Sequence, residues 1–396
     1  MVEIGQLRPF DLIVWFSALR SFRRLLIAQW NSIELKMRRA MPASRRRISS
    51  QRDSVRRRRE IGRVSRVTFL PLRLGQVMAA VLAIVTSASG AATPGAFPVP
   101  DWLYPSNSAQ ADKPVDDRMA EVHLAGSSVT YTETQLKDLF SAPDWGLQPH
   151  TPMPSVVAHG RPPDVLACGY CHTPSGQGRP ENASIAGLPA SYIAAQLEDF
   201  RGGKRRGVWP GPYVPTDLMI QSAQHLTDDE IRSAAQYFSM QQPARRVEVV
   251  EVAKVPRSRV VGLVYAAIQH GGTEPLGQRL MEFAPDPARH EHRDDAMRYT
   301  AYVPLNSVNR GRVLAIMGRP NSAVQPCTSC HGGDLRGVGL VPGIAGRSPT
   351  YLLRALLGFQ AGARQGSAAA PMQTVCGSLS LGDMIDTVAY AASLAP

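Results

Sequence analysis

The sequence predicts a mainly α-helical protein in which two similar halves are joined by a β-rich segment. Three observations support this fold class: an internal repeat, a cysteine motif in each copy, and valine-rich alternation between the copies. A chain of 396 residues is too long for one ordinary core and suits two or three domains. We expect a basic extension with a signal peptide, an irregular arm, a first helical domain, the β-rich segment and a second helical domain, over residues 1–92, 93–128, 129–242, 243–305 and 306–396.

The positive charge of the chain is confined to its N-terminal extension. Residues 1–92 contain 18 Lys and Arg against 5 Asp and Glu, which leaves 26 basic and 27 acidic residues for the rest. Domains without a net positive field lack the electrostatic attraction that dominates nucleic-acid binding. The sequence therefore predicts no nucleic-acid partner.

A secretory signal follows the basic stretch. Arg63, Arg66 and Arg73 precede a short apolar run over 77–85, and small residues fill 88–92. We expect cleavage near residues 90–92. The run is well below the roughly 20 residues of a spanning helix, so an uncleaved membrane anchor is the less favoured alternative. We expect export to the periplasm.

More than sixty residues precede this signal, although signals normally begin at the N-terminus. We expect translation to start near Val64 or Val67. The competing interpretation is a cytoplasmic arm in which residues 11–30 associate peripherally with a membrane surface, because arginines interrupt that stretch too often for a span.

Two C-x-x-C-H motifs carry the chemistry. They are typical of covalent haem c attachment, because two thiols on one helical turn reach both haem vinyl groups while the adjacent histidine becomes the proximal iron ligand. The sequence thus predicts two covalently attached haem c groups. The residues are Cys168, Cys171, His172, Cys327, Cys330 and His331.

An internal repeat predicts the sixth iron ligands. A shift of 159 residues superposes the two motifs together with 185–187 on 344–346, and a shift of 153 superposes later positions. Met219 falls on Met372, and each is the only methionine between its motif and the final helix of its half. A lone methionine is usually core filler. Equivalent placement after each motif favours axial ligation instead.

Other uses of the cysteines are less favoured. A zinc site built from both pairs would need ligands closer in sequence, and a thioredoxin-like motif would need a βαβ pattern that is missing around either pair. The fifth cysteine, Cys376, is expected to be a small buried residue, with a thiolate ligand as the sharper alternative. His290 and His292 are expected in a solvated loop, with metal binding as the alternative.

Local patterns place the main elements. Apolar spacing predicts short helices at 192–200 and 351–359, and capping boxes at Thr227 and Ser380 predict the final helix of each half. We also expect an N-terminal helix at 309–317 in the second half and a weaker one at 133–140 in the first, with strands at 246–255 and 260–268. The arm before residue 129 is expected to wrap on the first domain.

Both halves resemble class I cytochrome c domains, and the pair resembles dihaem, two-domain bacterial cytochromes c. The resemblance covers about 163–240 and 309–396 and implies one small helical fold per haem, with low-spin His/Met iron. It also implies electron transfer between a dehydrogenase donor and an oxidase or another cytochrome as acceptor, and haem attachment by the cytochrome c maturation machinery. The family often orients the proximal histidine through the carbonyl of a proline. Pro342 supplies it in the second half, whereas Ala183 replaces it in the first, and its carbonyl is still expected to hold His172.

The sequence shows no catalytic residues, and we therefore predict an electron carrier. The alternative is a haem enzyme, either dihaem peroxidase-like or an oxidoreductase of a small sulfur compound. Chemistry at iron needs a vacant or displaceable site, so two matched methionines count against an enzyme.

Overall fold

The structure is a computed structural model that describes residues 99–106 and 120–396. All of these belong to one compact unit, 91–396. The predictions for the signal peptide, the translation start and the basic extension lie outside the described residues. In the described part of the chain, no helix is long and apolar enough to cross a membrane.

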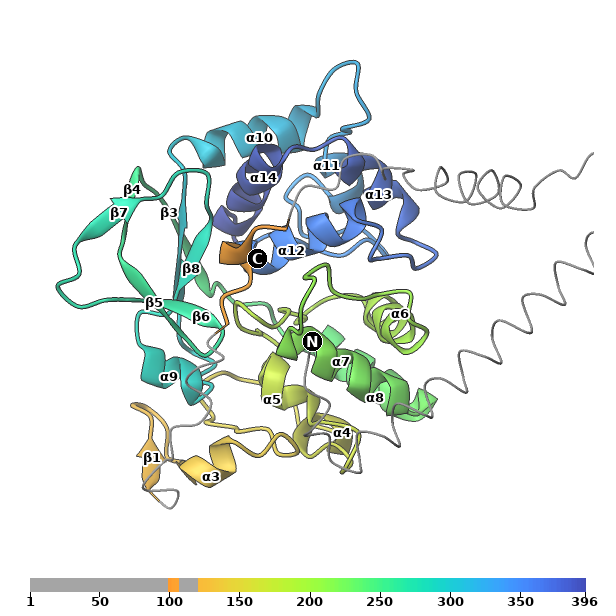
Figure 1. The fold of residues 1–396 in the computed structure, drawn as a ribbon. Coiled ribbons are helices and arrows are strands. Elements are labelled where there is room, and N and C mark those ends of the chain that lie inside the picture. The colour runs from red at the N-terminus through yellow and green to blue at the C-terminus, as the bar shows by residue number, and fades with distance from the viewer. Residues whose placement is uncertain (1–98, 107–119) are drawn as a thin grey trace, which may run out of the picture. The chain divides into compact units, whose positions relative to one another are not determined.

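The first half is helical around the first cysteine motif (Figure 1). The motif itself forms the short helix α5, and a capping box at Thr227 starts α8, as predicted. Ile193, Leu197 and Phe200 line the buried side of α6, which packs on α7 and α8. The helices are α3 (Glu133–Leu136), α4 (Ser155–Ala158), α5 (Cys168–His172), α6 (Ala190–Arg201), α7 (Val214–His225) and α8 (Asp228–Met240).

The N-terminal helix predicted for the first half is shorter than expected. Helix α3 ends at Leu136 and not at Phe140, and it follows a small hairpin of β1 (Glu121–His123) and β2 (Thr130–Thr132). A capping box at Thr132 starts α3, and Leu136 packs with Leu124 and Trp145 in a separate small core.

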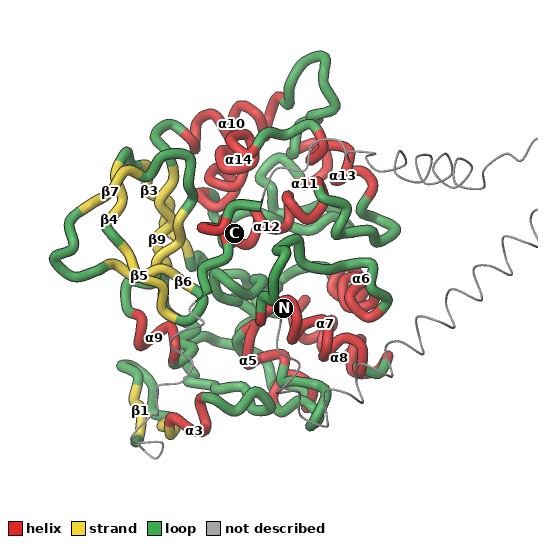
Figure 2. The backbone as a smooth tube through the Cα atoms, in the orientation of Figure 1, coloured by secondary structure: helices red, strands yellow, loops and turns green. Residues whose placement is uncertain are grey.

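The segment between the halves is β-rich, as predicted, but each predicted strand is divided: β3 and β4 lie where one strand was expected at 246–255, and β5 and β6 form a hairpin where one was expected at 260–268. Five of the strands make one mixed sheet in the order β3-β9-β8-β6-β5, in which β3 pairs parallel with β9, and β4 pairs with β7 outside it. Figure 2 shows the strands gathered in one region of the molecule. The elements are β3 (Val247–Glu251), β4 (Lys254–Pro256), β5 (Ser258–Val261), β6 (Val264–Ala267), β7 (Thr273–Pro275), β8 (Met281–Phe283), α9 (Pro287–Glu291) and β9 (Tyr299–Val303).

The second half repeats the helical order of the first. The predicted helix at 309–317 is present as α10, which packs closely on the final helix α14 because Gly311 leaves room for the backbone of Asp386. The sheet contacts this half through β3 on α14 and β8 on α12. The helices are α10 (Ser307–Met317), α11 (Thr328–His331), α12 (Pro349–Gln360), α13 (Ala370–Gly377) and α14 (Leu381–Ser393).

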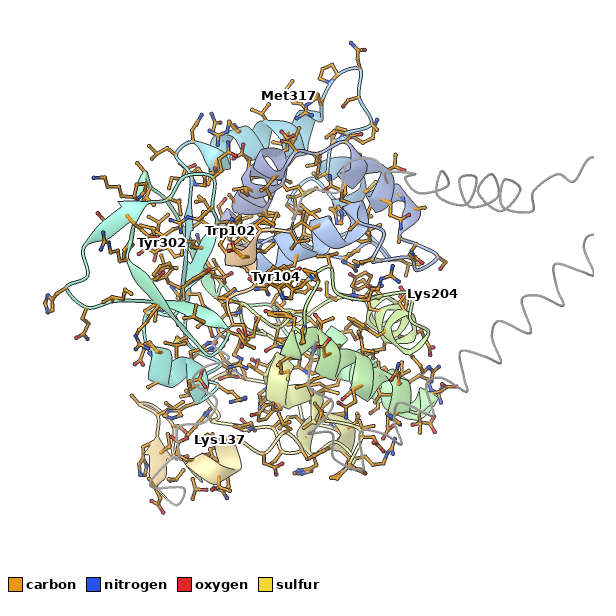
Figure 3. All side chains as sticks on the ribbon, in the orientation of Figure 1. Trp102, Tyr104, Lys137, Lys204, Tyr302 and Met317 are labelled. Atoms are coloured by element: carbon orange, nitrogen blue, oxygen red, sulfur yellow. The ribbon has the colours of Figure 1, made fainter. Side chains whose placement is uncertain are left out.

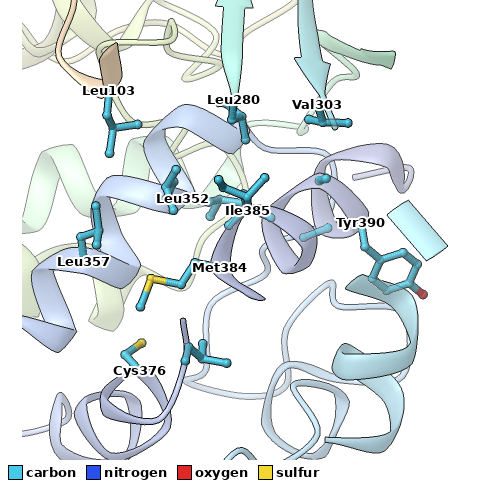
Figure 4. Packing of buried hydrophobic residues seen from close by; sticks show 14 of the residues in the cluster. Leu103, Leu280, Val303, Leu352, Leu357, Cys376, Met384, Ile385 and Tyr390 are labelled. Carbon is cyan, nitrogen blue, oxygen red and sulfur yellow. The ribbon is translucent and has the colours of Figure 1, made fainter. Parts of the chain in front are cut away.

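The largest hydrophobic cluster belongs to the second half. Leu353, Met384 and Ile385 of α12 and α14 are fully buried in it, and Leu280 and Val303 join it from the sheet region (Figure 4). The first half has its own cluster around Val157, Ile193 and Phe238. Each half therefore carries a separate core.

The prediction that the arm before residue 129 wraps on the first half is only partly correct, because its described residues contact the second half as well. Leu103, in the 3-10 helix η2 (Asp101–Leu103), is fully buried in the core of the second half, and its carbonyl accepts a hydrogen bond from Arg354. The next residue, Tyr104 (labelled in Figure 3), stacks on Trp209 of the first half, with ring centroids 5.1 Å apart. Residues 99–106 thus contact both halves.

Candidate functional site

The two motif histidines are held in the same way. Nδ1 of His172 lies 2.8 Å from the carbonyl oxygen of Ala183, and Nδ1 of His331 lies 2.8 Å from that of Pro342. A proton donated by Nδ1 leaves Nε2 as the lone-pair atom, which is the arrangement that a metal ligand requires. The expectation that Ala183 replaces the family's proline without loss of this bond is confirmed.

A single cavity collects the predicted residues of the first half. Cys168, Cys171, His172 and Met219 all line it. Its walls are mainly apolar and come from α6, α7 and α8, with Leu197 and Phe200 among them. The cavity thus brings two thiols, an imidazole and a thioether to apolar walls, which is the set of groups that an attached haem c requires.

Met219 and Met372 lie within helices that local patterns did not predict. Met219 is in the middle of α7 and lines the cavity, and Met372 is near the start of α13 and packs against the core of the second half. Proline occupies one of the first two positions of both helices, where its missing N–H costs no hydrogen bond. This proline was the available signal for the two helix starts.

The attachment cysteines lie in two separate cores. Cys168 packs in the cluster of the first half and Cys327 in that of the second. Burial raises the pKa of the Cys168 thiol to about 12 and that of Cys327 to about 11, so neither has the thiolate character of a redox-active cysteine. Cys376 is fully buried beside α12, as its simpler interpretation predicted.

Two arginines from equivalent positions of the halves meet at their junction. Arg205 and Arg364 form an antiparallel backbone bridge, and both guanidinium groups contact the side-chain oxygen of Gln196, at 2.7 and 2.6 Å. Arg205 also donates to the hydroxyl of Tyr351 at 3.0 Å, and Arg364 to that of Tyr192 at 3.3 Å. Each half thus donates a hydrogen bond from an arginine to a side chain of the other half.

Neither arginine forms an ion pair among the described residues. Burial lowers the pKa of Arg364, but Tyr192, Tyr351 and the Asp199 charge outweigh it and raise this pKa above its usual value. Arg364 is buried, and burial together with the neighbouring Arg364 charge lowers the pKa of Arg205. No described carboxylate lies within 4 Å of either guanidinium group. Buried charges are normally paired, so this junction fits a carboxylate-bearing cofactor. Arg205 and Tyr351 also line the cavity, where they would hold the propionate groups of a haem.

The prediction of a solvated loop around His290 is wrong. His290 lies on α9 with only 2% of its surface exposed, and its Nδ1 is 3.1 Å from the hydroxyl of Tyr299. His292 is also held, with Nε2 3.0 Å from a carboxylate oxygen of Glu133. The partners of both histidines are distant in sequence, which is why local polarity suggested exposure.

Comparisons with known proteins show what the chain is similar to. No family model matches the chain. A "thiosulfate dehydrogenase electron acceptor" of Stutzerimonas stutzeri (strain A1501) is 37% identical over 77 residues, which are 19% of this chain and 33% of that protein. A protein of the same name from Thiomonas intermedia (strain K12) is 23% identical over 217 residues, 54% of this chain and 72% of the relative. Cytochrome c-554(548) of Halomonas halodenitrificans is 37% identical over 79 residues, 20% of this chain and 88% of the relative.

Two solved structures are also similar. Thiosulfate dehydrogenase (TsdBA) from Marichromatium purpuratum has a TM-score of 0.40 at 25% identity, over 58% of this chain and 37% of that one. Cytochrome c4 of Acidithiobacillus ferrooxidans has a TM-score of 0.38 at 21% identity, over 57% of this chain and 98% of that one. The chain spans about a third of the first curated relative and of the first solved structure.

The repeated motif, the two anchored histidines and the lined cavity fit a c-type cytochrome. The chain belongs to the cytochrome c family, since it covers 88% of cytochrome c-554(548) at 37% identity. The predicted resemblance to c-type cytochromes is confirmed.

Proposed function

We propose that this chain carries electrons through two covalently bound haem c groups, one in each half. The observation that carries the proposal is the pair of histidines fixed by equivalent carbonyl groups next to attachment cysteines. Each haem, when bound, supplies a one-electron iron couple. The bonds from Ala183 and Pro342 keep each imidazole in one orientation, which limits rearrangement between oxidation states.

The proposed ligand set follows from the cavity and the repeat. Cys168 and Cys171 attach the first haem, and His172 and Met219 hold its iron. The second haem is attached and held by the equivalent residues, Cys327, Cys330, His331 and Met372. A thioether favours the ferrous state, so these methionines would keep both potentials high. The proposed domains extend over 129–242 and 306–396.

We propose a periplasmic dehydrogenase as the electron donor, and a thiosulfate dehydrogenase is the specific candidate. This proposal is supported by the names of two relatives, each called a thiosulfate dehydrogenase electron acceptor. The expected acceptor is an oxidase or another cytochrome. Export would also bring the chain to the cytochrome c maturation machinery.

Intact mass spectrometry of the exported protein tests the haem assignment. We expect the mass of two haems, because four cysteines form two attachment motifs. Replacing both Cys168 and Cys171 by Ala should remove one haem and leave the other, and replacing Cys376 should remove neither. A native protein that carries one haem or none contradicts the proposal.

Mixing with a purified thiosulfate dehydrogenase and thiosulfate tests the donor. We expect the absorption spectrum to show that both haems become reduced. We expect no reduction when the enzyme is left out. Reduction by ascorbate without reduction by the enzyme would reject this donor while leaving the carrier function intact.

A further inference from the structure

Helix α7, which carries Met219, is anchored at its two ends in different halves of the molecule. Near its C-terminal end, the hydroxyl oxygen of Ser222 accepts a hydrogen bond from the N–H of Leu166 at 3.1 Å, and Leu226 is buried in the first-half cluster. At its N-terminal end, the N-cap residue Tyr213 is buried in the second-half cluster. The start of the helix therefore depends on the second half, although the helix belongs to the first.

The loop that leads into α7 is fixed on the second half by main-chain hydrogen bonds. The N–H of Arg206 donates to the carbonyl of Ala363 at 3.0 Å, and the N–H of Gln365 donates to the carbonyl of Lys204 at 2.7 Å. Trp209 then packs against the second-half cluster. The chain is thus held by the second half before α7 begins.

The ring of Tyr213 is held by a residue of the arm. The ring of Tyr104 meets it edge-on, with centroids 4.9 Å apart, and both side chains are buried. The same Tyr104 ring stacks on Trp209, which precedes Tyr213 in the loop. Edge-to-face contact favours one relative orientation of two rings, so the pair restrains the position of Tyr213.

Arg354 of α12 completes this contact from the second half. Its guanidinium carbon lies 5.1 Å from the centroid of the Tyr104 ring and 5.2 Å from that of Tyr213. The side chain of Arg354 is itself fixed, because it donates to the carbonyls of Leu103 and Pro180, both at 3.0 Å. We call Tyr104, Tyr213 and Arg354 the Tyr213 cluster.

Burial within α7 is concentrated near its C-terminal end. Ser222 and Ala223 are the buried residues of this helix. An isolated helix of 12 residues is marginal in water, so contacts with other elements decide where its first turns lie. Met219 follows Tyr213 by six residues, which is about 9 Å along a helix axis. A displaced helix start would therefore displace the thioether as well.

The proposed methionine ligand of the second haem is held differently. Helix α13, which carries Met372, packs on α12 of the same half, and the side chain of Gln360 on α12 donates to the carbonyl of Cys376 at 2.9 Å. The connection from the junction arginine to the methionine is longer in the first half, 205–219, than in the second, 364–372. Dependence on the opposite half is thus a feature of α7.

From these contacts we propose that Tyr213 is a positioning residue for Met219, so that the arm and the second half hold the sixth ligand of the first haem in place. The proposal rests on the ligand set proposed above. A thioether favours ferrous iron, so its placement by the protein matters most in the oxidised state. Loosening the Tyr213 cluster should let another ligand replace Met219 at the first haem and leave the second haem unchanged.

Imidazole titration of the oxidised holo-protein tests this role, followed by the loss of the near-infrared absorption of iron–methionine bonding. Imidazole nitrogen replaces the thioether sulfur without a change of oxidation state. Tyr213→Ala should raise the imidazole affinity of one haem by about tenfold, the size of effect that loss of a ligand-supporting contact typically has, and leave the other haem unchanged. Tyr104→Ala should act in the same direction, and it tests the cluster even if Tyr213→Ala does not fold.

Three further variants identify the cause. Tyr213→Phe keeps the ring and should bind imidazole as the native protein does. Tyr213→Ala should add nothing to Met219→Ala, because the ligand that it positions is then absent. Ile231→Ala is the control for general destabilisation, since Ile231 is buried in the first-half core on α8 and is not among the residues that line the cavity. It should lower stability in denaturant and leave both imidazole affinities native.

Native imidazole binding in both Tyr213→Ala and Tyr104→Ala would overturn the inference. An equal gain in Ile231→Ala would overturn it too, because destabilisation alone would then explain the effect. A gain at both haems would show a general loosening of the molecule and contradict a role specific to Met219. If the native first haem shows no iron–methionine absorption, the proposed ligand itself is rejected, which separates failure of the ligand set from failure of the positioning role.

Discussion

At the scale of the residue, the anchoring of the proximal histidines depends on backbone atoms and not on side-chain identity. Ala183 and Pro342 differ in every side-chain property, yet their carbonyl oxygens lie at the same 2.8 Å from Nδ1 of His172 and His331. A carbonyl is available at every position, so this feature tolerates substitution wherever the loop path is kept. The proposed methionine ligands would act through their side chains and have no such freedom.

Replacing Met219 by Ala should alter the first haem alone. Loss of the thioether should remove about half of the near-infrared absorption of iron–methionine bonding and lower one potential on the order of 0.1 V, because thioether ligation favours ferrous iron. A redox titration followed by absorbance measures both effects. Met372→Ala should do the same for the second haem, and Met240→Ala, at an exposed site, should do neither. An unchanged spectrum in Met219→Ala would reject this ligand and make His225 the next candidate.

Asp295 should make the protein less stable as pH rises. Burial raises the pKa of Asp295 to about 6, although Ser175 donates a hydrogen bond to it at 3.0 Å. Since the unfolded value is about 4, the folded state binds more protons between about pH 4 and pH 6. The favourable contribution is complete below this range and is lost as pH rises through about 6.

Asp295→Asn should therefore unfold less readily than the native protein at neutral pH, by up to about 3 kcal/mol, and the difference should vanish near pH 4. Denaturant unfolding at several pH values measures it. Burial lowers the pKa of His290 to about 4, which gives a slope of opposite sign, so the two proteins are compared at each pH. Asp229→Asn, at an exposed pair with Arg232, is the control. A constant difference across the range would contradict the buried-carboxylate explanation.

At the scale of the element, the helix starts that were predicted are those fixed by local chemistry. The capping boxes at Thr227 and Ser380 are both present, since each needs only a residue three positions away. Helices α7 and α13 were not predicted, because their apolar residues do not recur with a clear helical period. Helix α7 lines the cavity of the first half, and α13 packs against the core of the second half. The order of the five-stranded sheet was also beyond local patterns, because the parallel pairing of β3 with β9 joins distant segments.

The two capping boxes should contribute similar stability. Thr227→Ala and Ser380→Ala each remove the side-chain oxygen that accepts a hydrogen bond from the third helical N–H, at 3.2 and 3.1 Å. Each should cost about 1 kcal/mol of unfolding free energy in denaturant titrations. Ser239→Ala removes a hydroxyl near the other end of α8 and should cost clearly less. Equal losses in all three variants would show that hydroxyl removal, and not capping, is being measured.

At the scale of the whole molecule, the halves are joined at equivalent positions of the repeat. Arg205 and Arg364 pair by backbone and share Gln196, and Arg347 of the second half donates to carbonyls of Ser184 and Ala186 in the first. Such fixed contacts would keep the distance between the two haems constant. The sequence repeat predicted the matching residues, but only the structure shows that they face one another.

Arg205→Gln should lower the potential of the first haem. A buried positive charge near the propionate groups favours the reduced iron, so its removal should favour the oxidised form. Spectroelectrochemical titration measures the shift. Lys204→Gln removes the same charge from the adjacent, exposed position (Figure 3) and should leave the potential nearly unchanged. Equal shifts in the two variants would mean that Arg205 acts only through net charge.

Carbon monoxide binding to the fully reduced protein tests the central claim most directly. The claim is that, in an electron carrier, histidine and methionine occupy the two axial positions of each iron. A haem iron with two axial protein ligands has no free coordination position for carbon monoxide. We therefore expect the spectrum of the native protein to stay unchanged. Met219→Ala, which opens one site, should bind carbon monoxide at one haem. Rapid binding to either haem of the native protein would contradict the account and favour a haem enzyme.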